Sequence, residues 1–212
     1  MLRINEIFHS IQGESTNTGL PCVFIRLTGC NIRCDYCDTE YAFFEGKSFS
    51  LEEVVEKVKS YNCKLVELTG GEPLLQKGSI ELMKILADEG FDVMLETNGS
   101  IDISEVDKRV KIIMDLKGPS SKEVDKNLYE NIDLLKNTDE VKFVIADKKD
   151  FDWAKETVGK YELDKKAIVL FSPSFGNIAM EELVKWILKD NLNVRFQMQI
   201  HKYIWSPEMR GV

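Results

Sequence analysis

The chain has 212 residues, a formal net charge of -8 at pH 7 and 43% hydrophobic residues. This length can bury one full hydrophobic core, so we expect a single domain spanning residues 1–212. The acidic balance argues against a nucleic-acid partner, which usually requires clustered Lys and Arg. No apolar stretch has the length of a signal-peptide core or a membrane span, so we expect a cytoplasmic protein with no membrane partner.

Short β-rich segments alternate with amphipathic segments along the chain. Strands are predicted at 22–28, 64–69, 91–97, 110–116, 140–146, 167–171 and 193–200. Helices are predicted at 50–61, 79–89, 121–136, 148–160 and 178–190, and Ser50 with Glu53 forms a capping-box pattern before the first. This order is typical of a parallel sheet with crossover helices. A complete eight-fold barrel needs about 250 residues, so the sequence predicts an α/β fold, an incomplete TIM-like β/α barrel of about six or seven mainly parallel strands. An open doubly wound sheet is the alternative.

Polar residues stand out just beyond the C-terminal ends of the predicted strands. They comprise Cys30 to Thr39, "TGGEP" (69–73), "ETNG" (96–99), Asp115 with Lys117, Ser172 and His201. Parallel α/β folds gather their active sites at that edge of the sheet. We therefore expect the active site on the C-terminal face of the strands.

Three cysteines, Cys30, Cys34 and Cys37, follow the first predicted strand with the spacing C-x3-C-x2-C. Thiolates suit zinc and iron–sulfur clusters, but a structural zinc requires a fourth ligand. Cys22 lies within the preceding strand, and Cys63 is expected to pack as a small apolar residue. A four-iron cluster held by three cysteines keeps one iron open for a small molecule. A zinc protein or a plain electron-transfer protein is the non-enzymatic alternative.

The segments "CNIRCDYC" and "TGGEP" together resemble the radical S-adenosylmethionine (SAM) superfamily. The resemblance implies a [4Fe-4S] cluster held by Cys30, Cys34 and Cys37, with SAM bound at the open iron. One electron, from a donor such as flavodoxin, then cleaves SAM to a 5′-deoxyadenosyl radical.

The flanking segments "EIFHSIQGES", "LTGGEPLLQ", "LETNGS" and "QIHKYIW" resemble the 7-carboxy-7-deazaguanine synthase family from Glu6 to Val212. The resemblance implies a Mg2+-dependent conversion of 6-carboxy-5,6,7,8-tetrahydropterin to 7-carboxy-7-deazaguanine with loss of ammonia, in queuosine-type 7-deazapurine biosynthesis. It also implies that SAM is regenerated and that the protein is a homodimer. A radical activase that acts on a partner protein is the alternative enzyme.

The resemblance assigns roles to residues at matching positions. SAM contacts are Tyr36, Cys37, Asp38, Gly71 and Glu96, with a looser match at Asp115, Leu116, Lys117 and Ser172. Thr39 matches a magnesium ligand, and Ile11, Gln12, Gly13, Arg26 and Thr69 match substrate contacts. No catalytic side chain is expected beyond these ligands. "DLKGP" (115–119) and "FSPSFG" (171–176) depart from the family pattern, which leaves the last four SAM contacts less specific.

Arg26 is also singled out by the strand pattern itself. Val23, Ile25 and Leu27 should face one side of the strand, and Cys22, Phe24 and Arg26 the other. An arginine in such a strand needs an anionic partner. That partner is either a substrate carboxylate, held by the bidentate guanidinium, or a carboxylate of the chain itself.

Overall fold

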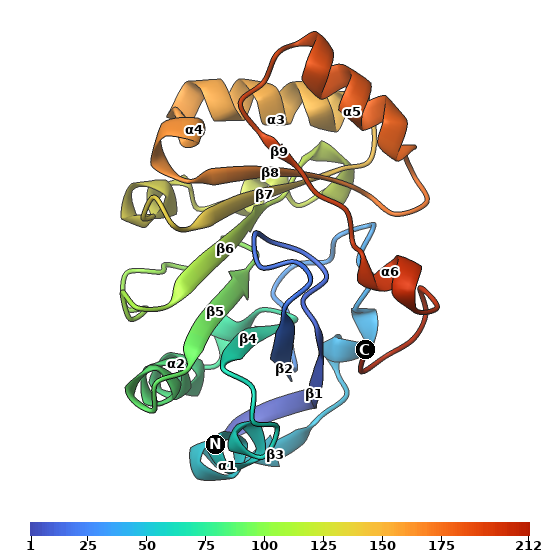
Figure 1. The fold of residues 1–212 in the computed structure, drawn as a ribbon. Coiled ribbons are helices and arrows are strands. Elements are labelled where there is room, and N and C mark those ends of the chain that lie inside the picture. Colours follow the sequence, from blue (N-terminus) through green and yellow to red (C-terminus); the bar gives the residue numbers. More distant parts are fainter.

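The computed structural model describes residues 1–212, whose nine strands form one curved sheet (Figure 1). The strand order is β3-β1-β2-β4-β5-β6-β7-β8-β9. Six parallel pairings join the seven strands from β2 to β9, and β1 pairs antiparallel with β2 and β3. The edge strands β3 and β9 do not pair with each other, so the barrel is open. The prediction of an incomplete barrel with about seven mainly parallel strands is confirmed.

The strands are β1 (Leu2–Ile11), β2 (Pro21–Leu27), β3 (Lys47–Phe49), β4 (Leu65–Gly70), β5 (Asp92–Thr97), β6 (Lys111–Leu116), β7 (Glu140–Ile145), β8 (Ile168–Pro173) and β9 (Arg195–Phe196). All seven predicted strands are present, although β9 has only two residues. The sequence reasoning missed β1 and β3. Both form antiparallel ladders at one edge of the sheet, outside the strand–helix repeat on which the prediction rested.

The helices are α1 (Leu51–Lys59), α2 (Gly78–Asp88), α3 (Lys148–Tyr161), α4 (Leu163–Lys166), α5 (Met180–Lys189) and α6 (His201–Ile204). The capping box of Ser50 and Glu53 at the start of α1 is confirmed. The helix predicted at 121–136 is wrong, because the segment forms three short 3-10 turns, Pro119–Ser121, Val124–Lys126 and Tyr129–Leu134. Its Asn127 and Asn131 side chains bond to the backbone of neighbouring loops and so compete with helical hydrogen bonds.

The two faces of the sheet carry different side chains. Helices α1, α2, α3 and α5 cover the convex face, whereas α6 and the C-terminus lie at the open side (Figure 1). Val23, Ile25 and Leu27 are buried in the main core, on the helix-covered face. Cys22 and Phe24 belong instead to a small second cluster, so the predicted alternation along β2 is confirmed. No helix is long and apolar enough to cross a membrane.

Candidate active site

A cavity of about 990 Å³ opens at the C-terminal ends of the strands. Every strand-end residue predicted for the site lines it except Leu116: Cys30, Cys34, Tyr36, Cys37, Asp38, Thr39, Thr69, Gly71, Glu96, Asp115, Lys117 and Ser172. The predicted substrate contacts Ile11, Gln12, Gly13 and Arg26 line it as well. The predicted location of the site on this face of the sheet agrees with this arrangement.

Leu116 is the one predicted cofactor contact that does not line the cavity. Its side chain is fully buried in the main core, on the opposite face of β6 from Asp115. Successive residues of a strand point to opposite faces, so Asp115 and Lys117 face the cavity and Leu116 cannot. The Leu116 side chain therefore does not reach the cavity, and only the backbone of Leu116 is left for the predicted cofactor contact.

The cysteine loop (residues 30–39) presents its three thiols to the cavity, whereas Cys22 lies in the buried second cluster. Cys63 lies outside the cavity, with its Sγ 3.3 Å from the Pro21 carbonyl oxygen. No three His, Cys, Asp or Glu side chains converge closely enough to hold a single metal ion. A four-iron cluster takes each thiolate at a different iron and needs no such convergence, so three soft ligands without a fourth fit that cluster.

The "TGGEP" segment is fastened to the cysteine loop through its backbone. Glu72 N donates to Gly29 O at 2.7 Å, and a Cβ at Gly71 would overlap that same carbonyl group. The Glu72 carboxylate is fully buried and accepts hydrogen bonds from Leu74 N, Thr97 Oγ1 and Asn98 N. Burial raises the pKa of Glu72, although these hydrogen bonds oppose the rise. Glu72 thus joins the loops that follow β4 and β5.

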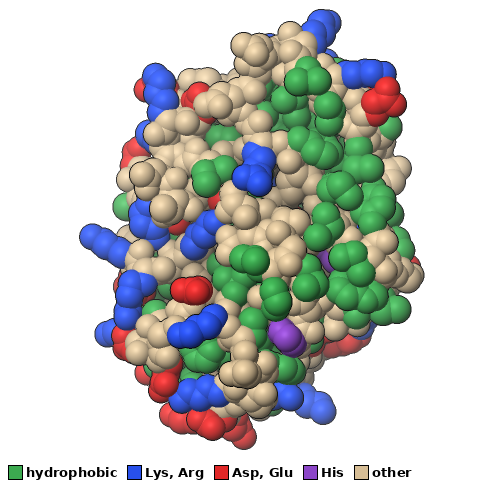
Figure 2. All heavy atoms as spheres, viewed as in Figure 1, with side chains coloured by type: hydrophobic (Ala, Val, Ile, Leu, Met, Phe, Trp, Pro, Cys, Tyr) green, Lys and Arg blue, Asp and Glu red, His purple; other side chains and the backbone are tan.

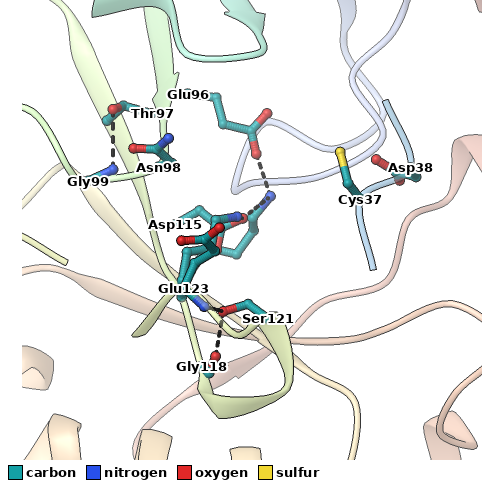
Figure 3. Close-up of polar contacts among 12 residues, drawn as sticks. Cys37, Asp38, Glu96, Thr97, Asn98, Gly99, Asp115, Gly118, Ser121 and Glu123 are labelled. Atoms are coloured by element: carbon teal, nitrogen blue, oxygen red, sulfur yellow. Dashed lines mark hydrogen bonds and ion pairs between the residues drawn. The ribbon is translucent and has the colours of Figure 1, made fainter. Parts of the chain in front are cut away.

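Lys142 of β7 is a buried cation that lines the cavity beside Glu96 and Asp115, which are labelled in Figure 3. Its Nζ bonds to Glu96, lies 3.1 Å from Glu14 Oε2 and lies 3.4 Å from Asp115 Oδ2. Burial alone would raise the pKa of Glu96, but the charge and hydrogen bond of Lys142 outweigh it and lower the pKa. Lys117 forms a second contact with Asp115, at 2.9 Å.

Glu67 of β4 is a buried acid that also lines the cavity. Its Oε2 accepts a hydrogen bond from Gln12 Nε2. Burial raises the pKa of Glu67 well above its ordinary value, and the negative charges of Glu96 and Glu14 raise it further. Burial and these neighbouring carboxylates thus both disfavour the charged form of Glu67.

Sequence reasoning missed Glu14, Glu67 and Lys142, and it included Glu72 and Asn98 only as members of "TGGEP" and "ETNG", without a role of their own. A signal for two of them was present, because "VELT" and "VKFV" place Glu67 and Lys142 inside otherwise apolar strands. Charged residues are rarely buried without partners, which is the argument that singled out Arg26.

Arg26 has a partner within the chain. Its Nε donates to Glu6 Oε1 at 2.8 Å, and the Tyr41 hydroxyl donates to the same oxygen at 3.0 Å. The ion-pair alternative is thus present in the structure, but it occupies only one of the three guanidinium nitrogens. The two terminal nitrogens of Arg26 form no hydrogen bond within the chain. Arg26 can therefore still bind a carboxylate through them.

The C-terminal segment packs directly against the "QGE" segment that follows β1. Ile200 N donates to Gly13 O at 3.0 Å, and a Cβ at Gly13 would overlap the His201 ring. Gln199 Nε2 donates to Glu14 Oε1 at 2.8 Å. Burial lowers the pKa of His201, so its imidazole is neutral at pH 7. The C-terminal segment therefore completes one wall of the cavity.

The aromatic Tyr36 and the acidic Asp38 of the cysteine loop have contrasting surroundings. The Tyr36 hydroxyl is buried without a hydrogen-bond partner. Asp38 Oδ2 lies 2.7 Å from Lys202 Nζ. Burial would raise the pKa of Asp38, but Lys202 and Gln199 together lower it to about 2. Asp38 is therefore an anion throughout the working pH range.

Comparison with known proteins assigns this site to a family. Residues 24–163 match the family model of the Radical SAM superfamily. The whole chain is 44% identical to the 7-carboxy-7-deazaguanine synthase of Chlorobaculum tepidum, of which it covers 97%, and 42% identical to that of Koribacter versatilis, of which it covers 100%. The chain belongs to the 7-carboxy-7-deazaguanine synthase family. The crystal structure of QueE from Escherichia coli shares the fold, with a TM-score of 0.79, 22% identity and 93% of each chain covered.

Family membership confirms the resemblance inferred from the motifs and sets aside the activase alternative. The chain is a radical SAM enzyme of the lyase class, and its superfamily implies a [4Fe-4S] cluster, SAM and an electron donor. The zinc-protein and electron-transfer alternatives are thereby excluded as well.

Proposed function

We propose that this chain converts 6-carboxy-5,6,7,8-tetrahydropterin to 7-carboxy-7-deazaguanine with loss of ammonia. One observation carries the proposal: the cysteine loop and the carboxylate-binding Arg26 open into the same cavity of about 990 Å³. Pockets for single small ligands span about 300–1,000 Å³, so a cavity of this size can hold two small ligands side by side. We propose that residues 1–212 form one domain, because a single sheet contains all nine strands.

Cys30, Cys34 and Cys37 would hold the cluster, since all three thiols line the cavity and no fourth cysteine does. When bound, the cluster and SAM supply a one-electron reductive cleavage that begins radical chemistry. Tyr36, Asp38, Gly71 and Glu96 line the same cavity and would bind SAM. The flat ring of Tyr36 suits a purine, and Glu96 can accept hydrogen bonds from ribose hydroxyls. Asp115, Lys117 and Ser172 are further cavity-lining candidates for SAM contacts.

The substrate carboxylate would bind between Arg26 and a magnesium ion held by Thr39. The two free terminal nitrogens of Arg26 can donate in parallel to both carboxylate oxygens. Thr39 Oγ1 makes only a 3.8 Å contact with Cys37 Sγ and is otherwise available. A single neutral hydroxyl cannot hold magnesium against its hydration, so the substrate carboxylate must complete the site.

The pterin ring would lie against the segment that follows β1. Ile11, Gln12 and Gly13 line the cavity there. Thr69 of β4 also lines it, and its Oγ1 donates to Glu96 Oε2 of the neighbouring strand β5 at 3.0 Å. Gln12 Nε2 also donates to Glu67 Oε2, which places two polar side chains beside the proposed ring position. Polar edges of a pterin require such hydrogen-bonding partners in a buried site.

Flavodoxin is the electron donor that we propose, and a homodimer is the proposed assembly. The dimer is supported by apolar side chains that gather on one face of the molecule, on the right of Figure 2. Phe175, Tyr203, Ile204 and Met209 are among the exposed large hydrophobic residues. Contiguous exposed apolar surface of this kind is typical of a protein–protein interface. Sedimentation equilibrium of the anaerobic protein would test the dimer.

The test is an anaerobic assay with the carboxytetrahydropterin, SAM and reduced flavodoxin or dithionite, which follows the ultraviolet absorbance of the deazaguanine product. We expect product in large excess over the SAM consumed, since the proposed reaction regenerates SAM. Cys34→Ala serves as the matched control without the cluster. Stoichiometric 5′-deoxyadenosine without deazaguanine product would contradict the proposed reaction.

A further inference from the structure

Asn98 follows β5, and its side-chain amide reaches the cysteine loop. Its Nδ2 lies 3.8 Å from Cys30 Sγ and 3.1 Å from Asn31 Oδ1. The amide nitrogen has two hydrogens, so each acceptor can receive one of them. Only 7% of Asn98 is exposed, which shields the N–H···S contact from water.

The orientation of the Asn98 amide is determined by its neighbours. Its Oδ1 accepts hydrogen bonds from Ser100 N at 3.0 Å and from Ser100 Oγ at 2.6 Å. Exchanging the oxygen and nitrogen would set the amide oxygen against Asn31 Oδ1 and the NH2 group against the Ser100 N–H. The hydrogen-bond network therefore aims the N–H, and not the oxygen, at Cys30.

The backbone of Asn98 is held independently of this amide. Asn98 N donates to Glu72 Oε2 at 2.7 Å, and Thr97 Oγ1 contacts both oxygens of the same carboxylate, at 2.9 and 3.0 Å. Replacing the Asn98 side chain leaves these bonds intact. The effect of the amide can thus be separated from the folding of the loop.

We propose that Asn98 donates a hydrogen bond to the cluster-bound sulfur of Cys30 and thereby raises the reduction potential of the [4Fe-4S] cluster. Reduction adds one electron from the donor, forms and breaks no bond, and takes up no proton. The added negative charge spreads onto the cysteine sulfurs, where an N–H dipole stabilises it. Asn98 is a positioning residue that acts through Cys30. The proposal rests on the proposed cluster ligands and not on the substrate.

The test is potentiometric titration of the reconstituted protein, monitored by electron paramagnetic resonance, without SAM or substrate. Asn98→Leu keeps the size of the side chain but removes the donor, so its midpoint potential should be lower than that of the wild type. Its resonance Raman spectrum should show a shifted Fe–S(Cys) stretching frequency. Ser100→Ala is the matched control. It removes two bonds of the same network, from Ser100 Oγ to Asn98 Oδ1 and from Asn31 Nδ2 to Ser100 Oγ, but it leaves the Asn98 N–H donor and the Ser100 N–H that orients the amide. Its potential should equal the wild-type value.

A fully loaded Asn98→Leu protein with the wild-type potential and Fe–S frequency would overturn the proposal. Asn98→Asp is the second variant, since it has the shape of asparagine but turns the donor into an anionic acceptor, and its potential should be lower still. If neither variant assembles four irons, Asn98 has a structural role and the proposal is also overturned. A wild-type protein without any [4Fe-4S] signal would instead contradict the proposed function itself.

Discussion

Replacing Lys142 by methionine should destabilise the protein strongly at neutral pH. Only 7% of the Lys142 side chain is exposed, and it faces the carboxylates of Glu14, Glu96 and Asp115. Removing one partner of a buried ion pair costs about 3–5 kcal/mol, because the remaining charge is left uncompensated. Glu14 and Glu96 are 20% and 26% exposed and Asp115 keeps Lys117, so we expect about 3 kcal/mol, the lower end of that range.

The loss of stability should depend on pH in a defined direction. In the wild type, Lys142 lowers the pKa of Glu96, so this pair contributes stability above the unfolded pKa of about 4.3. Without Lys142, only the Thr69 hydrogen bond and the more distant charge of Lys117 oppose burial, so the pKa of Glu96 rises relative to the wild type. This rise costs stability at neutral pH but progressively less as the pH falls. Lys142 itself has a raised pKa and is charged throughout this range. The difference between variant and wild type should therefore be larger at pH 8 than at pH 5.

Anaerobic urea denaturation at pH 8 and pH 5, followed by tryptophan fluorescence at matched iron content, measures the free energy of unfolding of variant and wild type at each pH. A loss of about 3 kcal/mol corresponds to a decrease in Tm of about 6–12 °C for a chain of this size. Lys185→Met is the control, since Lys185 and Glu181 form a surface pair with side chains 70% and 79% exposed; it should change stability by less than about 0.5 kcal/mol. A loss below about 1 kcal/mol at pH 8, or equal losses at both pH values, would refute the reasoning.

Three further outcomes are expected. Alanine at Cys30, Cys34 or Cys37 should abolish the visible absorbance of the reconstituted protein, whereas Cys63→Ala should retain it, because Cys63 lies outside the cavity. Thr39→Ala should abolish magnesium stimulation of turnover but preserve SAM binding, measured by isothermal titration; unchanged stimulation would exclude Thr39 as the metal ligand. Gly13→Ala should decrease kcat/KM at least about tenfold with the cluster spectrum intact, because its Cβ displaces His201 and with it the C-terminal wall; wild-type turnover would contradict that packing.

Much of the fold followed from local sequence pattern. The seven parallel strands were predicted because each is a short apolar run followed by an amphipathic helix or a loop. The alternation along β2 placed Arg26 on the cavity face, and the same rule directs the Leu116 side chain into the core, between the inward-facing Asp115 and Lys117. Cys30, Cys34 and Cys37 without a fourth ligand favoured an open four-iron cluster over zinc, and the resemblance to the radical SAM superfamily implied it.

Other features depend on contacts between residues far apart in the chain. β1 and β3 are stabilised by antiparallel pairing at the edge of the sheet, which the strand–helix repeat does not encode. The segment 121–136 lacks a helix because its asparagine side chains bond to the backbone of neighbouring loops.

The chemistry of the cavity is likewise set by distant partners. Lys142 meets Glu14 across 128 positions, and Asn98 meets Cys30 across 68. Local patterns determine which face of a strand a side chain occupies, because backbone geometry fixes that alternation residue by residue. Only the register and curvature of the assembled sheet decide which charges then lie within reach of one another, and hence which carboxyl pKa is raised or lowered and which amide points at a cysteine sulfur.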